Sequence, residues 1–105
     1  MKKETRDRLE KAGFRIGSVK EFLQLSDEEV AFVELKLALA TFLREVRNRD
    51  GVTQTEIARR LGSSQSRVAK MEAADPSVSI DLLIRTLLAL GVSRKRVGQV
   101  ISRAA

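Results

Sequence analysis

The 105-residue sequence contains no cysteine and no histidine. These two absences exclude disulfide bonds, zinc sites built on thiolate or imidazole ligands, and nucleophilic systems that need a cysteine or a histidine base. They also exclude a histidine-based switch near neutral pH. We therefore expect neither a metal site nor a cofactor.

Aromatic residues and long apolar runs are also scarce. The only aromatic residues are four phenylalanines, which argues against an aromatic stacking platform for single-stranded nucleic acid. No stretch approaches the roughly 18 uninterrupted apolar residues that a membrane span requires, and the charged opening residues lack the apolar run of a signal peptide. We expect a cytoplasmic protein that does not enter a membrane.

An enzymatic function has little support in the sequence. The neighbouring carboxylates Glu28 and Glu29 are adjacent on an expected helix and do not face each other across a cleft. No glycine-rich loop suited to phosphate is present, and no nucleophile has an evident base beside it. We expect a protein that is not an enzyme.

Positive charge is present in excess and is unevenly distributed. The length suits one compact domain, and the formal net charge is +6 with a pI of about 10.3. Residues 1–52 carry 11 basic and 10 acidic side chains, whereas residues 53–105 carry 9 and 4. Such a bias is typical of proteins that bind nucleic acid.

The stretch that begins at Thr53 predicts two short helices joined by a tight turn. Thr53 can accept a hydrogen bond from the backbone N–H of Glu56, and the Glu56 carboxylate can reach back to complete a capping box. Gly62 stands where a left-handed residue would end the first helix. Ser63 or Ser64 can then cap the second helix.

Each of these helices has one apolar face. In the first helix, the apolar side chains are Ile57, Ala58 and Leu61; in the second, Val68 and Met71 point inward with Ser64 and Glu72. The second helix has an opposite face that is short, mostly polar and suited to a DNA major groove. That face and its flanks comprise Gln65, Ser66, Arg67, Ala69, Lys70 and Ala73.

These residues resemble the helix-turn-helix motif of the phage-repressor (Xre) family. The matching positions are Gln54, Ile57, Ala58, Leu61, Gly62, Val68 and Met71, and the resemblance extends over residues 43–91. It implies an all-α fold, namely a five-helix repressor-like helix-turn-helix domain with an N-terminal extension. It also implies a transcriptional repressor that binds double-stranded DNA as a homodimer on an inverted repeat.

The resemblance, together with side-chain chemistry, assigns roles in DNA binding to individual residues. In the family, the glutamine at the position of Gln54 typically binds a backbone phosphate, and the first residues of the second helix contact bases. The expected base-reading residues are Gln65, Ser66, Ala69 and Lys70. The expected phosphate-binding residues are Gln54, Ser64, Arg67 and Ser77.

Glu72 and the loop that follows it have expected structural roles. A lone carboxylate at the inward edge of the second helix would be costly, and the family places an arginine at the position of Arg47 to pair with it. The family often has glycine where Ala74 stands, so a left-handed backbone there would cost about 1 kcal/mol more. Pro76 blocks helix continuation, and Ser79 can cap the next helix.

Three further helices are expected outside the motif. A capping box at Ser26 opens the longest helix, which should run to about Asp50. Its apolar side chains form two rows: Val30, Val33, Leu37 and Ala40 in one, and Leu35, Leu39, Phe42 and Val46 in the other. An apolar core helix should follow over residues 80–90, and Ser93 should cap a last helix with its own apolar stripe.

The N-terminal region leaves two interpretations open. We expect residues 1–25 to form an arm and residues 26–105 to form the helix-turn-helix domain. The arm carries apolar residues, including Phe14, Ile16, Phe22 and Leu23, that would leave an apolar patch if nothing covered them. They fold onto the core in one interpretation and bind a partner or a second copy in the other.

The alternative function is that of an antitoxin. Small members of the family, including those similar to HigA-type antitoxins, often neutralise a small ribonuclease-type toxin and also repress their own operon. The apolar residues of the arm and the extended helix after Ser26 offer surface for such a toxin partner.

Overall fold

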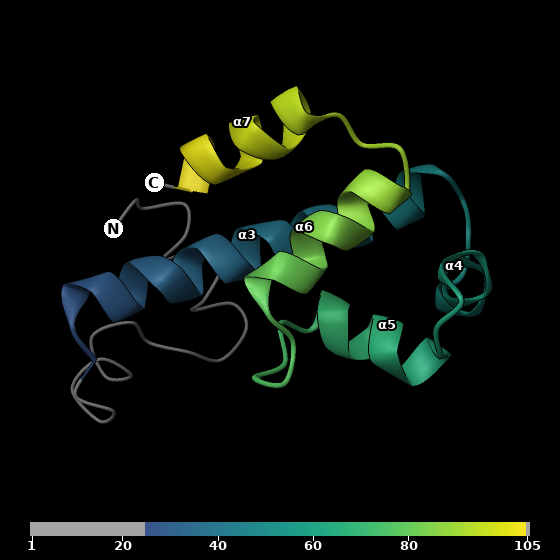
Figure 1. Ribbon diagram of the computed structural model, residues 1–105, viewed down its shortest axis with the longest axis horizontal. Helices are drawn as coiled ribbons and strands as arrows, with labels where there is room; N and C mark the ends of the chain where they lie inside the picture. The colour runs from purple at the N-terminus through teal and green to yellow at the C-terminus, as the bar shows by residue number, and fades with distance from the viewer. Residues whose placement is uncertain (1–24, 105) are drawn as a thin grey trace.

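A computed structural model describes residues 25–104, which fold into helices joined by short loops (Figure 1). The helices are α3 (Asp27–Arg49), α4 (Gln54–Leu61), α5 (Gln65–Glu72), α6 (Ile80–Ala89) and α7 (Arg94–Ala104). No strand occurs within this range, so the predicted all-α fold is confirmed. The expectations for the apolar residues before Leu25 lie outside the described residues.

Serine and threonine side chains begin the helices, as their positions predicted. The side chains of Ser26, Thr53, Ser64, Ser79 and Ser93 each accept a hydrogen bond from a backbone N–H in the first turn of their helix. The N-cap of α5 is Ser64, one of the two serines, Ser63 and Ser64, that were expected as its cap. Each cap satisfies an N–H group that has no partner within its helix.

The capping box is complete at Ser26 but not at Thr53. Ser26 and Glu29 exchange both hydrogen bonds. At Thr53 only the bond from the Glu56 backbone forms, and the Glu56 carboxylate instead accepts hydrogen bonds from Arg59, the shortest at 2.7 Å. The predicted reciprocal bond at Thr53 was therefore wrong, because a neighbouring guanidinium is a stronger donor to a carboxylate than a backbone amide is.

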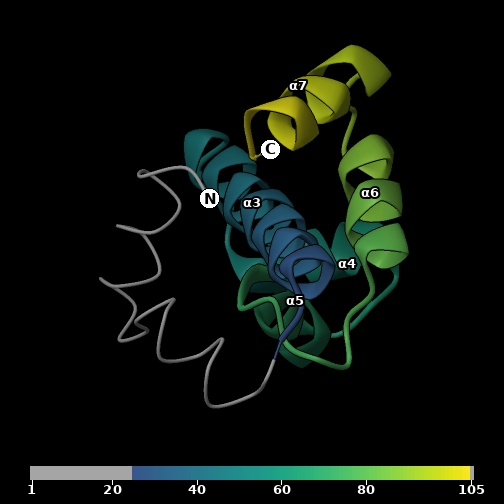
Figure 2. The same cartoon turned by 90° about the vertical axis from the view of Figure 1, so that its left-hand side faces the viewer.

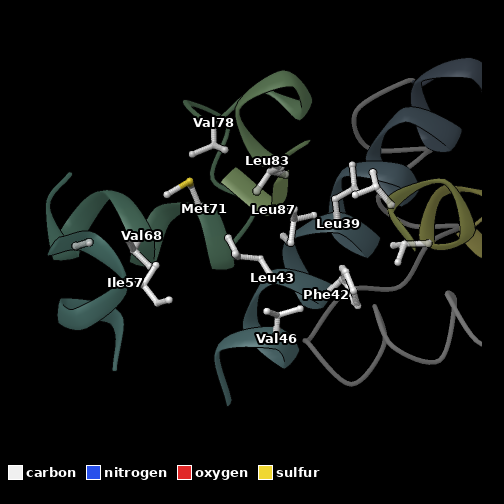
Figure 3. Packing of buried hydrophobic residues seen from close by; sticks show 14 residues of the cluster. Leu39, Phe42, Leu43, Val46, Ile57, Val68, Met71, Val78, Leu83 and Leu87 are labelled. Carbon is white, nitrogen blue, oxygen red and sulfur yellow. The ribbon is translucent and has the colours of Figure 1, made fainter. Parts of the chain in front are cut away.

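Helix α3 forms the centre of the molecule, and α5, α6 and α7 pack around it. Figure 2 looks nearly along α3 and shows these helices on different sides of it. Leu39 and Leu43 are fully buried, and Phe42 and Val46 are nearly so (Figure 3). The predicted rows omitted Leu43, which is fully buried, and included Val33, which is 41% exposed. Among residues 25–104, the apolar side chains that α3 buries all lie in its second half, from Leu39 to Val46.

Helices α6 and α7 complete the hydrophobic core. Leu83 and Leu87 of α6 are fully buried, as the apolar spacing predicted. Helix α7 packs on α3, and its buried side chains are Val97, Val100 and Ala104. The guanidinium of Arg96 lies 4.9 Å from the centre of the Phe42 ring, a cation–π contact that also links α7 to α3.

Within residues 25–104, no helix combines the length and the apolar character needed to cross a bilayer.

Candidate nucleic-acid interface

Helices α4 and α5 pack closely against each other across a tight turn. Gly62 ends α4 with φ of 64°, in the left-handed region that glycine adopts at little cost. Ile57 and Ala58 of α4 and Val68 of α5 are buried between the helices and the rest of the core. The small side chain of Ala58 allows the two helices to approach closely.

One face of α5 points away from the core. Gln65, Ser66 and Lys70 are exposed, whereas Ala69 is half-buried. Figure 1 shows α5 on the opposite side of the molecule from α7, with its outer side open. The structure therefore brings the four expected base-reading residues together on one helix, with Ala69 set deeper than the other three.

A hydrogen bond between two glutamines joins the beginnings of α4 and α5. Nε2 of Gln65 donates to Oε1 of Gln54 over 2.7 Å. Nε2 of Gln54 donates in turn to Oε1 of Glu72 over 3.2 Å. Since each amide nitrogen carries two hydrogens, both glutamines keep one N–H group for another acceptor.

Arg47 and Glu72, expected as an ion pair, lie within hydrogen-bonding distance beneath this face. Glu72 is only 5% exposed at its side chain, and its oxygens accept bonds from Nε and Nη2 of Arg47 at 2.6 and 3.0 Å. The Arg47 guanidinium also donates to the carbonyl oxygen of Val52. Hydrogen bonding to Glu72 raises the pKa of Arg47 above its ordinary value, so the guanidinium stays charged.

Ser64 and Arg67 lie at the start of α5 beside the glutamine pair. Oγ of Ser64 accepts a hydrogen bond from the backbone N–H of Arg67, and its hydroxyl also lies 3.4 Å from Oγ of Ser66, where either oxygen can be the donor. The Arg67 side chain is exposed and makes no hydrogen bond or ion pair with any residue between 25 and 104. Arg67 therefore has donors available for an anion, and Ser64 has one when the hydrogen between the two serine hydroxyls comes from Ser66.

The loop between α5 and α6 is held by Asp75. Its Oδ1 accepts hydrogen bonds from Oγ and from the backbone N–H of Ser77, at 2.7 and 2.9 Å. These two bonds, with the hydroxyl contributing most, lower the pKa of Asp75 below its ordinary value. The carbonyl oxygen of Asp75 accepts a 2.8 Å hydrogen bond from Nζ of Lys36 on α3. Both hydrogen-bond donors of Ser77, its hydroxyl and its backbone N–H, are therefore already bonded to Asp75.

Ala74 adopts the left-handed backbone that the family resemblance implied. Its φ is 53°, and it is the one non-glycine residue with positive φ among residues 25–104. This conformation lets the chain leave α5 and turn towards α6, but it brings Cβ close to the following carbonyl oxygen.

The exposed surface of α4 is less positive than its two arginines suggest. Arg59 and Arg60 both reach the carboxylate of Glu56, with shortest distances of 2.7 and 3.4 Å. Hydrogen bonding from Arg59 is the main reason why the pKa of Glu56 is lowered. This pairing leaves Arg67, near the start of α5, and Lys70, in its last turn, as the more available positive charges on that helix.

Two contacts in this region were missed by sequence reasoning: the bond between Gln54 and Gln65, and the bond from Lys36 to Asp75. The first had a usable signal, because both glutamines directly follow an N-cap and so begin neighbouring helices. The second had none, since its partners are 39 residues apart and meet only in the folded chain.

Comparison with known proteins agrees with this geometry. A family model described as "Helix-turn-helix domain" matches residues 38–99, a range that begins within α3 and ends within α7. Neither a curated protein nor a solved structure gave a match. The chain belongs to the helix-turn-helix domain family.

Proposed function

We propose that this protein is a sequence-specific transcriptional repressor that binds an inverted-repeat operator as a homodimer. The observation that carries the proposal is the exposed first turn of α5, where Gln65 is held by its bond to Gln54. A polar side chain held in place at the start of an exposed helix is suited to contact base edges in a major groove. Two copies, about 34 to 36 Å apart, would each contact one half-site.

The free hydrogen-bonding groups of α5 match those of bases. Gln65 retains its Oε1 and one N–H, the pair needed to accept from N6 and donate to N7 of adenine. Lys70 is exposed and can donate to O6 or N7 of guanine. Ser66 supplies an adaptable polar contact, and the half-buried Ala69 suits a thymine methyl group that projects into the groove.

Contacts with backbone phosphates would fix the position of α5 along the DNA. We assign them to the second N–H of Gln54, to the hydroxyl of Ser64 and to the unpaired guanidinium of Arg67. Ser77 is a weaker candidate, because Asp75 already accepts from both of its donors and brings a negative charge beside any phosphate. We therefore leave Ser77 out of the proposed phosphate set.

Fluorescence anisotropy with the DNA upstream of the protein's own gene tests the proposal. The wild type should prefer this DNA to a scrambled duplex, and binding should weaken steeply with salt through counterion release. Gln65→Ala and Lys70→Ala should each lose about 1 to 3 kcal/mol of discrimination at one base pair. Ser102→Ala, an exposed change on α7, serves as the matched control.

The two kinds of failure have different meanings in this assay. Equal binding of the wild type to upstream and scrambled DNA would overturn self-regulation. Discrimination that survives in both the Gln65 and the Lys70 variants would overturn base reading by α5.

A second candidate, an antitoxin, is favoured by the first half of α3. Phe32 and Val33 are exposed by 53% and 41%, and Asp27, Glu28 and Glu29 form an acidic first turn before them. An apolar patch beside acidic side chains is complementary to a basic protein, and a ribonuclease-type toxin must be basic to bind RNA. This half of α3 also precedes the residues that match the family model.

Co-expression with the product of a neighbouring reading frame tests the antitoxin hypothesis. The wild type should relieve growth inhibition by that product, and Phe32→Glu should not, because it places a charge in the apolar patch. Thr55→Glu, an exposed change on α4, is the control for added negative charge. A neighbouring product that does not inhibit growth, or equal relief by all three proteins, would contradict the hypothesis.

A further inference from the structure

A cleft of about 370 Å³ lies between the turn after α4, helix α5 and helix α6. Its size is within the range of small-molecule sites in proteins. The apolar part of its lining includes Leu61, Met71 and Leu82. Helix α5 packs mainly on α3 and α4, and α6 packs mainly on α3 and α7, so α5 and α6 contact each other little and the cleft lies between them.

Two hydroxyl groups in the lining have unused hydrogen-bonding capacity. Oγ of Ser63 is buried and has no hydrogen-bond partner within residues 25–104. Oγ1 of Thr86 donates only to Sδ of Met71, at 3.4 Å, and sulfur is a weak acceptor. Leaving a buried hydroxyl unpaired is unfavourable, so a polar group entering here would gain bonds that the protein does not make itself.

The charged groups of the lining are all positive. Arg67 from α5 and Arg85 from α6 both line the cleft. Arg67 makes no ion pair with the described residues, whereas Arg85 pairs with Asp81 at 3.2 Å on the surface, both side chains being more than 70% exposed. Exposed pairs of this kind contribute little stability, so Arg85 can turn to another anion at small cost.

We propose that this cleft binds a small apolar molecule that carries a carboxylate. The apolar body would lie against the half-buried Leu61 and Leu82. The carboxylate would accept bonds from Arg67 and Arg85, and the buried Ser63 hydroxyl would turn towards it to supply a further donor. Guanidinium groups bind carboxylates with paired, charge-assisted hydrogen bonds. The apolar part of the lining distinguishes this site from one for inorganic anions.

Occupancy of the cleft would act on DNA binding through Arg67. This consequence rests on the proposed function, in which the same guanidinium contacts a phosphate. A carboxylate held by Arg67 would compete with that phosphate, so the ligand would weaken operator binding. The site would then make the regulator responsive to a small organic acid.

An NMR titration of the full chain tests binding without reference to DNA. Indole-3-acetate should shift the amide signals of Ser63, Arg85 and Thr86 in a saturable manner. The matched indole-3-acetamide, which lacks the charge, should bind about tenfold more weakly. Acetate, which lacks the apolar body, should give no saturable shift at millimolar concentration.

Variants test whether indole-3-acetate binds in the cleft or is attracted to positive charge anywhere on the protein. Arg85→Gln and Ser63→Ala should each weaken binding of indole-3-acetate, by about tenfold and about threefold respectively. Arg94→Gln, which removes an exposed arginine of α7 outside the cleft, should leave binding unchanged. Equal binding of the acid and the amide, shifts outside the cleft, or equal loss in the Arg85 and Arg94 variants would overturn the proposal.

Anisotropy with operator DNA then tests the regulatory consequence separately. Saturating indole-3-acetate should weaken DNA binding by the wild type but not by Arg85→Gln. A ligand that binds the cleft in the NMR titration without changing DNA affinity would overturn only the link to regulation. A protein that binds the ligand but no DNA would overturn the proposed function and leave the cleft site standing.

Discussion

Arg47 holds Glu72 through two parallel hydrogen bonds, from Nε to Oε2 at 2.6 Å and from Nη2 to Oε1 at 3.0 Å. The bonds connect the last turn of α3 to the last turn of α5. Because Gln54 also donates to Oε1 of Glu72, the pair supports the glutamine that begins α4 as well.

Replacing Arg47 should destabilise the fold strongly. Arg47→Ala leaves the Glu72 carboxylate buried without its charge partner, and we expect a loss of about 2 to 4 kcal/mol in the free energy of unfolding. Urea denaturation measures it. Arg49→Ala is the matched control, because its contact with Asp50 is longer, 3.6 Å, and exposed, so it should cost at most about 0.5 kcal/mol. Similar losses in both variants would show that the buried pair has no special role.

Glycine at position 74 should stabilise the protein. Ala74 has φ of 53°, and removing its Cβ relieves a strain of about 1 to 2 kcal/mol, of which roughly half is lost to the greater freedom of unfolded glycine. We expect a net gain of about 0.5 to 1 kcal/mol in thermal or urea unfolding. Ala73→Gly is the control: φ is −87° there, so glycine should only destabilise. If Ala74→Gly lowered the free energy of unfolding as much as Ala73→Gly does, the backbone at Ala74 would not be strained.

Gln54 should affect base selectivity although we propose that it contacts only phosphate. Gln54→Ala removes the acceptor that holds Nε2 of Gln65, so discrimination at the base pair read by Gln65 should fall along with overall affinity. Anisotropy on single-base operator variants gives both quantities. In a double-mutant cycle, the Gln54 and Gln65 changes should be non-additive. Additive effects would show that the two glutamines act independently on DNA.

Asp75 should make the loop before α6 sensitive to acid. Hydrogen bonds from Ser77 lower its pKa in the folded protein below the ordinary value of 3.8. The associated stabilisation is therefore present above that value and is lost as the pH falls through the lowered pKa. Ser77→Ala should move the Asp75 pKa back towards 3.8, as measured by carboxyl-carbon NMR. The Ser102→Ala variant should leave it unchanged, and an unaltered Asp75 pKa in Ser77→Ala would refute the role of the hydroxyl.

Local features of the fold were predictable because they depend on residues close in sequence. A hydroxyl side chain directly before an apolar pattern marks the start of a helix, and this holds at Ser26, Thr53, Ser79 and Ser93. Gly62 marked the turn for the same reason, since few other residues adopt its backbone angles cheaply. The expected pairing of Arg47 with Glu72 came instead from the family resemblance.

Contacts between distant residues could not be predicted in the same way. The amine of Lys36 meets a backbone carbonyl at Asp75, and backbone carbonyls carry no sequence signature. The placement of Arg96 over the Phe42 ring depends on how α7 crosses α3. The unpaired hydroxyl of Ser63 and the cleft that it helps to line depend on how α5 and α6 are placed in the folded chain.

The bond from Lys36 to the Asp75 carbonyl ties the first half of α3 to the domain that follows it, so the two cannot be exchanged independently. Lys36 precedes the residues that match the family model, whereas Asp75 lies within them, in the loop after the proposed recognition helix. A chimera that exchanges the first half of α3 would therefore have to keep an amine at position 36. Without it, the transplanted domain would lose an anchor that its own residues do not supply.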